Sequence, residues 1–165
     1  MHYQDKLTCV PFSVIMTSVS TMTVIIDADA CPVVRIAIGE AKKRNIPVTC
    51  VCDTSHEFND DYANTVIVDK GRDSADLRVV NLCSCGDIVI TQDYGVASMA
   101  LAKKAKCINQ NGLYYTEDNI DFLMSMRHAA SVERRKSKSH MKGPSKRTKQ
   151  DDEKFLSSFI KLLDL

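Results

Sequence analysis

Short apolar runs that end in aspartate recur along the first hundred residues of the chain. They cover residues 23–27, 47–53, 65–69 and 87–93, and valine and isoleucine predominate in them. Runs of this length and composition are typical of β-strands. Because the runs are apolar at nearly every position instead of alternating, each is expected to be covered on both faces, as in a parallel sheet. The pattern therefore predicts four parallel strands, each closed by a carboxylate.

Apolar residues at helical spacing fill the intervals between these strands. Residues 33–44, 74–83 and 95–104 form three such segments, and a fourth begins near Glu117. An amphipathic helix is expected at 152–163, after a basic linker at 131–149. The alternation predicts an α/β fold, specifically a three-layer α/β/α sandwich with a mainly parallel sheet, followed by the basic linker and the C-terminal helix.

The chain has 165 residues, of which 44% are hydrophobic, and this is enough for one domain at 22–165. Residues 1–21 are expected to be an extension outside the fold, with Met1 and Met22 as alternative starts; Met22 directly precedes the first strand and is preferred. No apolar run approaches the roughly 18 residues of a membrane-spanning helix. The segment before Met22 is also a poor signal peptide. We therefore expect a soluble, cytoplasmic protein.

The seven cysteines allow two less favoured interpretations, a zinc site and a reactive thiol. An odd number of cysteines in a chain without secretion signals favours reduced thiols over disulfides. Two C-x-C pairs, at 50–52 and 83–85, allow a zinc site, although structural zinc usually has two to four intervening residues. Cys31 precedes a predicted helix and is either an acidified thiol or a small core residue, and the core residue is preferred. His56 is interpreted as an exposed loop residue rather than a ligand or base.

Aspartate carboxylates are the favoured candidates for a functional site. The carboxyl ends of parallel strands meet at one rim of the sheet, where ligands bind in α/β folds. The candidate metal ligands are Asp27, Asp29, Asp73, Asp76 and Asp93, of which all but Asp73 are also candidate catalytic residues. Carboxylates gathered at one place repel one another, and Mg2+ or Mn2+, which prefer oxygen ligands, would offset that repulsion. The sequence thus predicts a magnesium or manganese site.

A structural role is the alternative for each of these acids. Asp73 and Asp76 suit the first turn of a helix, where the helix dipole favours negative charge without a metal. Asp53 and Asp69 also end predicted strands, and they are weaker candidates for the site.

Charge divides the chain into an acidic body and a basic arm. Residues 23–126 carry 15 acids and 10 bases, net −5, whereas residues 127–149 carry 9 bases and one acid, net +8. The candidate nucleic-acid-binding residues of this arm are Arg134, Arg135, Lys136, Lys138, Lys142, Lys146 and Arg147. Such residues suit phosphate contacts with RNA or another single-stranded nucleic acid, and a solvated linker is the alternative.

Four ordered motifs resemble a known family. They are D-A-D-A-C-P-V at 27–33, G-R-D-S-A-D at 71–76, G-D-I-V-I-T-Q-D at 86–93, and N-Q-N-G at 109–112 followed by Y-T-E-D-N-I at 115–120. Over about residues 22–163 the chain resembles the YaiI/YqxD family of bacterial proteins, which looks like a member of the PIN-like superfamily. The resemblance implies a PIN-like domain with a metal-dependent ribonuclease site at the five candidate ligands.

Three functions compete at this point. The first is a Mg2+- or Mn2+-dependent nuclease that acts on RNA. The second is a non-catalytic PIN-like protein that binds nucleic acid. The third is a phosphatase of the haloacid-dehalogenase type, because Asp27-x-Asp29 follows an apolar strand; Cys31, where that class has threonine, argues against it.

Overall fold

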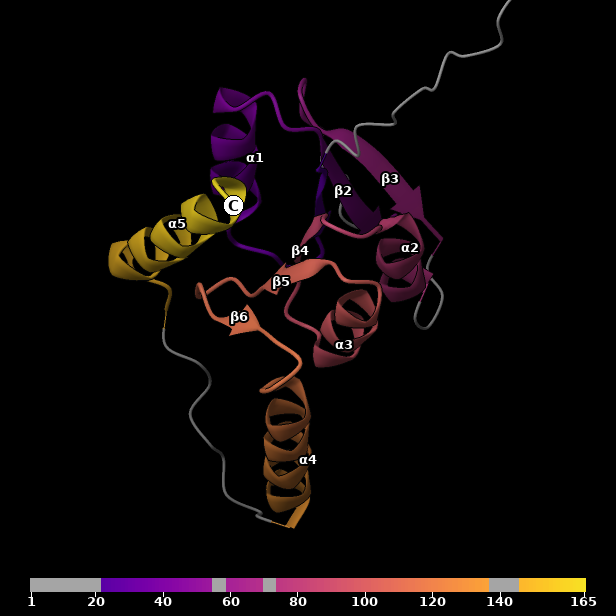
Figure 1. Cartoon of the computed structure of the whole chain (residues 1–165). Helices are drawn as coiled ribbons and strands as arrows, with labels where there is room; N and C mark the ends of the chain where they lie inside the picture. Colours follow the sequence, from indigo (N-terminus) through magenta and orange to yellow (C-terminus); the bar gives the residue numbers. More distant parts are fainter. Residues whose placement is uncertain (1–21, 55–58, 70–73, 137–145) are drawn as a thin grey trace, which may run out of the picture.

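The computed structural model describes residues 22–54, 59–69, 74–136 and 146–165. Six strands and five helices are found in this part of the chain (Figure 1). The strands are β1 (Val24–Asp27), β2 (Val48–Asp53), β3 (Asn64–Val68), β4 (Ile88–Ile90), β5 (Lys106–Ile108) and β6 (Tyr114–Tyr115). The helices are α1 (Val34–Lys43), α2 (Ser74–Leu82), α3 (Tyr94–Ala102), α4 (Ile120–Lys136) and α5 (Lys149–Leu163).

All six strands belong to one sheet in the order β3-β2-β1-β4-β5-β6. The first five are parallel, and β6 pairs with β5 in the antiparallel direction. In the register of the central strands, Val24 of β1 lies between Val48 of β2 and Ile88 of β4. The predicted mainly parallel sheet is confirmed, with β1 inside it and β4 beside β1.

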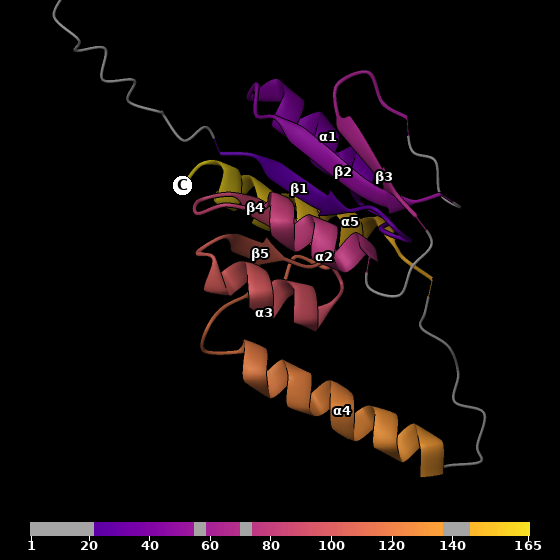
Figure 2. The same ribbon diagram turned by 90° about the vertical axis from the view of Figure 1, so that its right-hand side faces the viewer.

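Helices cover both faces of the sheet, as the apolar strands require. On one face α1 and α5 pack against Val24 and Ile26, and on the other α2 and α3 pack against Ile25 and Val89. Figure 2 shows α2 and α3 in front of the sheet with α5 behind it. Val24, Ile25 and Ile26 of β1 are each at most 1% exposed, which explains why this strand is apolar at every position before Asp27. The predicted three-layer α/β/α sandwich is confirmed.

The predicted linker at 131–149 is wrong at both ends. Helix α4 continues to Lys136, because the residues before it favour helix and neither glycine nor proline interrupts them. Helix α5 begins at Lys149 instead of 152, since Thr148 caps it: its hydroxyl accepts a hydrogen bond from the Asp151 N–H, and the Asp151 carboxylate accepts one from the Thr148 N–H. In both views α4 runs away from the sheet (Figures 1 and 2).

Two sequence predictions stay predictions, because the residues concerned lie outside those that the structure describes. They are the N-terminal extension at 1–21 and the exposed loop position of His56. Within the described ranges, no helix is both long and apolar enough to cross a bilayer.

Candidate acidic site at the strand ends

Asp27 is the last residue of β1 and stands at the carboxyl end of the central strands. Its Oδ2 accepts a hydrogen bond of 2.8 Å from the Thr91 hydroxyl, which follows β4. Thr91 is only 1% exposed and its own Oγ1 accepts the Asp93 N–H. The pairing of β1 with β4 brings these residues together although 64 positions separate Asp27 from Thr91. Thr91 therefore holds the Asp27 carboxylate in place, a role that the sequence did not reveal.

The surroundings of Asp27 raise the pKa of its carboxyl group. Burial raises the pKa of its carboxyl to about 6, and the Thr91 hydrogen bond partly opposes that rise. The negative charges of Asp76, Asp29 and Asp93 raise the pKa further, in that order. These carboxylates come from α2, from the loop after β1 and from the start of α3. The fold thus brings four of the five predicted ligands into one electrostatic neighbourhood.

Asp29 connects the loop after β1 to the end of β2 at this rim of the sheet. Both of its carboxylate oxygens accept the backbone N–H of Asp53, at 3.1 and 3.2 Å. Asp53 is the last residue of β2, so its main chain rather than its predicted carboxylate takes part in this contact. The hydrogen bonds fix the loop after β1 against the end of β2.

The Asp93 carboxylate contacts the start of α3 and a cation of α4. Its Oδ1 caps α3 by accepting the N–H groups of Gly95 and Val96, at 2.7 and 3.2 Å. Its Oδ2 forms an ion pair of 3.2 Å with Arg127 of α4, whose guanidinium also lies 5.4 Å from the centre of the Tyr94 ring. Arg127 was absent from the sequence predictions, since only tertiary packing brings α4 to the start of α3.

Two further predicted acids stand differently from these four. Asp73 lies outside the described residues, so its place in the site stays a prediction. Asp69 is exposed and follows β3, which β2 separates from β1. Within the described residues, no three histidine, cysteine, aspartate or glutamate side chains are grouped as metal ligands. The donor chemistry nevertheless fits a hard divalent cation, because carboxylate oxygens whose charges oppose one another would be relieved by it.

Comparison with known proteins gives the chain a family. Residues 25–165 match the model of a family described as "Uncharacterized BCR, YaiI/YqxD family". The chain belongs to the YaiI/YqxD family. It is 50% identical to the UPF0178 protein of Clostridium acetobutylicum over 143 residues, 86% of this chain and 97% of the relative. The UPF0178 protein of Alkaliphilus oremlandii is 52% identical over 143 residues, 87% of this chain and 92% of the relative. No solved structure gives a significant match.

These names state a family and no activity, so the function of this YaiI/YqxD chain has to be argued from its residues. The resemblance inferred from the four motifs is confirmed at the family level. Membership of the PIN-like superfamily stays a prediction.

The basic arm of this family member is not a single solvated segment. Arg134 and Arg135 are exposed on the last turns of α4, and Lys146 is exposed before α5. Arg147 is instead held by Asp152 at 2.6 Å, by the Gln110 carbonyl at 2.8 Å and by the Asn111 Oδ1 at 3.3 Å. The side chain of Lys136 and the whole of Lys138 and Lys142 lie outside the described residues. Arg147 therefore acts as a bridge between α5 and the turn after β5.

Cys31 is a poor nucleophile. Burial raises the pKa of its thiol to about 11, so the thiol stays protonated near neutral pH. Its side chain packs against the core cluster that contains α1 and α5. The acidified-thiol alternative is therefore wrong, because desolvation of the half-buried thiol outweighs the backbone N–H groups of Val33 and Val34, which lower its pKa.

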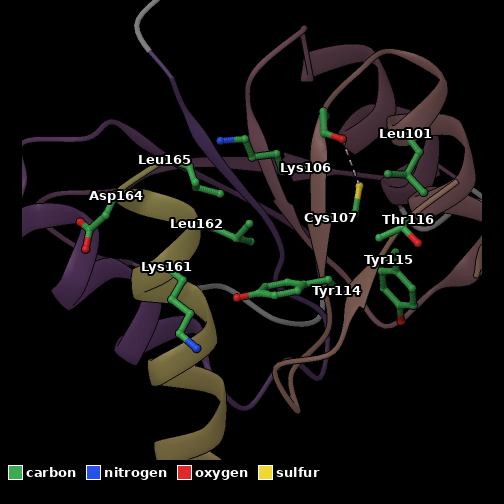
Figure 3. A pocket seen from close by; sticks show the side chains of 11 residues that line it. Leu101, Lys106, Cys107, Tyr114, Tyr115, Thr116, Lys161, Leu162, Asp164 and Leu165 are labelled. Carbon is green, nitrogen blue, oxygen red and sulfur yellow. Dashed lines mark hydrogen bonds between the residues drawn. The ribbon is translucent and has the colours of Figure 1, made fainter. Parts of the chain in front are cut away.

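Two pockets differ in their relation to the acidic site. A polar pocket of about 340 Å³ adjoins it, with Ala30 from the loop after β1 and Gln92 from the residue before Asp93 in its lining. A larger pocket of about 840 Å³ lies where β5 begins and α5 ends (Figure 3). Leu101, Tyr114 and Leu162 give the second pocket a mainly apolar lining. Of these two pockets, the polar one shares the carboxyl ends of the strands with the acids.

Proposed function

We propose that this protein is a metal-dependent nuclease that hydrolyses phosphodiester bonds in RNA. The observation that carries the proposal is Asp27: it ends the central parallel strand, and burial and three neighbouring carboxylates raise its pKa to about 6. Perturbed carboxylates at the carboxyl ends of parallel strands mark functional sites more often than ordinary surfaces. The PIN-like resemblance supports the same chemistry.

Asp27, Asp29, Asp76 and Asp93, with Asp73, would hold Mg2+ or Mn2+. When bound, such a cation supplies an acidified water and stabilises the charge on the leaving oxygen. Thr91 orients Asp27 through its 2.8 Å hydrogen bond, and the Asp53 N–H orients Asp29. Arg127 places a positive charge beside Asp93, where the phosphate of a substrate would need it.

Exposed cations support nucleic acid as the substrate. Arg134, Arg135 and Lys146 can each contact a backbone phosphate and release counterions, which makes binding weaken with salt. Within the described part of the arm no aromatic residue lies between these cations, so phosphate contact rather than base stacking is the expected mode for the arm.

The test is cleavage of single-stranded RNA by purified protein with Mn2+. The wild type is compared with Asp27→Asn/Asp93→Asn, which removes two central charges, and with Asp69→Asn, which changes the same residue type just after the outer strand β3. We expect the double variant to lose cleavage at least about a hundred-fold and Asp69→Asn to keep it. Equal cleavage by the wild type and the double variant would refute the assignment of these acids.

A non-catalytic RNA-binding protein is the second candidate, and the contacts of Asp93 favour it: the α3 N-terminus and Arg127 already satisfy that carboxylate. Salt-sensitive RNA binding that needs residues 131–149 but neither metal nor Asp27 would select this candidate.

The phosphatase candidate loses support, because both oxygens of Asp29, its expected acid, accept the Asp53 N–H. Trapping of a beryllium fluoride adduct on Asp27 would restore it.

A further inference from the structure

The polar pocket of about 340 Å³ has the position of a substrate subsite. It lies beyond the ends of β1, β4 and β5, and its lining includes neighbours of two candidate ligands: Ala30 follows Asp29, and Gln92 precedes Asp93. Its size lies at the small end of the roughly 300 to 1,000 Å³ that is usual for ligand sites. The pocket therefore lies beside the segments that carry two of the candidate ligands.

Two amide side chains in this pocket are held in known orientations. The Gln92 Nε2 donates to the Ala30 carbonyl at 3.2 Å, so its oxygen is the end left for a ligand. The Asn111 Oδ1 accepts from Arg147 at 3.3 Å, so its NH2 group is the end left for a ligand. The pocket thus offers an acceptor from Gln92 and a donor from Asn111. Side-chain amides with a fixed donor and acceptor suit the edges of nucleobases.

A third amide in the lining is incompletely bonded. Among the described residues, the Oε1 of Gln110 is a buried side-chain oxygen without a hydrogen-bond partner. Such an orphaned acceptor is uncommon in native proteins and calls for a ligand or an ordered water.

The turn that carries Gln110 and Asn111 is built rigidly. The Asn109 Oδ1 accepts the N–H groups of Asn111 and Leu113, at 2.8 and 3.0 Å. Gly112 has a φ of 81°, and a Cβ there would lie 2.8 Å from the Lys154 carbonyl oxygen of α5. Glycine is therefore required for the turn to pack against α5. The N-Q-N-G motif serves to hold the pocket in shape before any ligand arrives.

We propose that this pocket binds a nucleobase of the RNA strand next to the phosphodiester at the acidic site, through the amides of Gln92, Gln110 and Asn111. The inference rests on the proposed nuclease function for its choice of ligand. The ring of Pro32, which is exposed in the lining, provides a flat apolar surface for one face of the base.

The test measures binding of adenosine, cytidine, guanosine and uridine to the full chain by ligand-observed NMR titration, with ribose as the control ligand. Divalent cations and RNA are left out, so that the result does not depend on turnover. Asn111→Asp keeps an oxygen for Arg147 but removes the donor, and Gln92→Glu removes the contact to the Ala30 carbonyl. Gln150→Glu makes the same charge change at an exposed position of α5 outside this pocket.

We expect at least one nucleoside to bind better than ribose, and its affinity to fall at least about five-fold in Asn111→Asp and Gln92→Glu but not in Gln150→Glu. Circular dichroism checks that each variant is folded. Binding of ribose as strong as that of every nucleoside, absence of nucleoside binding, or unchanged affinity in both pocket variants would overturn the proposal. Loss of the nuclease function alone would show in the RNA cleavage assay and leave these titrations unchanged.

Discussion

Asp27 and Asp87 lie at opposite ends of the paired strands β1 and β4 and have opposite surroundings. Asp87 precedes β4, is 6% exposed, and accepts the N–H groups of Thr23 at 2.9 Å and Ser84 at 2.8 Å. Asp27 ends β1 and accepts the Thr91 hydroxyl, and its pKa is raised by burial and, to a smaller extent, by three nearby carboxylates. Backbone donors make Asp87 a structural residue, whereas burial and like charges make the ionised form of Asp27 costly without a cation.

Removal of the structural aspartate should have the largest effect. Asp87→Ala leaves two backbone N–H groups at the start of the sheet without their acceptor, and we expect the free energy of unfolding to fall by about 2 to 4 kcal/mol. Urea unfolding followed by circular dichroism measures it. Asp61→Ala, at an exposed position before β3, should change stability by less than about 0.5 kcal/mol. Equal losses in the two variants would remove the distinction drawn for Asp87.

Asp27, the aspartate of the candidate site, should behave in the opposite way. The pKa of Asp27 is raised from 3.8 to about 6, so the stability that its protonated form contributes is complete below pH 3.8 and is lost as pH rises through 6. Asp27→Asn stays neutral and keeps an acceptor for Thr91. We expect it to be more stable than the wild type by about 1 to 3 kcal/mol at pH 8 and by almost nothing near pH 3.5. A variant less stable than the wild type at pH 8 would contradict the raised pKa.

Thr91→Val tests the hydroxyl donor that stabilises ionised Asp27. Valine has a similar shape but no hydroxyl, so the pKa of Asp27 should rise above about 6. Carbon-13 NMR titration of the aspartate carboxyl groups measures this pKa directly. Thr49→Val in β2 is the control, because it makes the same substitution at a position that pairs with Ile25 of β1 instead of Asp27. A pKa that stays the same or falls in Thr91→Val would show that the 2.8 Å contact does not hold in solution.

Arg127→Ala should give the smallest change in stability. Its ion pair with Asp93 is partly exposed on both sides, and such pairs contribute about 0.2 to 1 kcal/mol. The same substitution removes a positive charge that competes with a divalent cation, so Mn2+ should bind somewhat more tightly. Isothermal titration calorimetry with MnCl2 measures that affinity, and weaker binding in the variant would show that Arg127 does not compete with the cation.

Much of the fold could be predicted from the sequence because β1 to β4 are apolar enough to leave a clear pattern. Strands β5 and β6 span only three and two residues, which is too short for any periodicity, and they were missed. The acids could be placed at one rim because parallel strands end together. The contacts of Thr91 with Asp27 and of Arg127 with Asp93 join residues 64 and 34 positions apart, and local patterns carry no signal of them.

A crystal of the full chain grown with Mn2+ tests the central comparison most directly. We predict an anomalous density peak within coordination distance of the Asp27 carboxylate at the carboxyl ends of β1 and β4, and none at Asp87. A crystal that contains Mn2+ but shows no peak at Asp27, with Asp93 still paired to Arg127, would contradict the account.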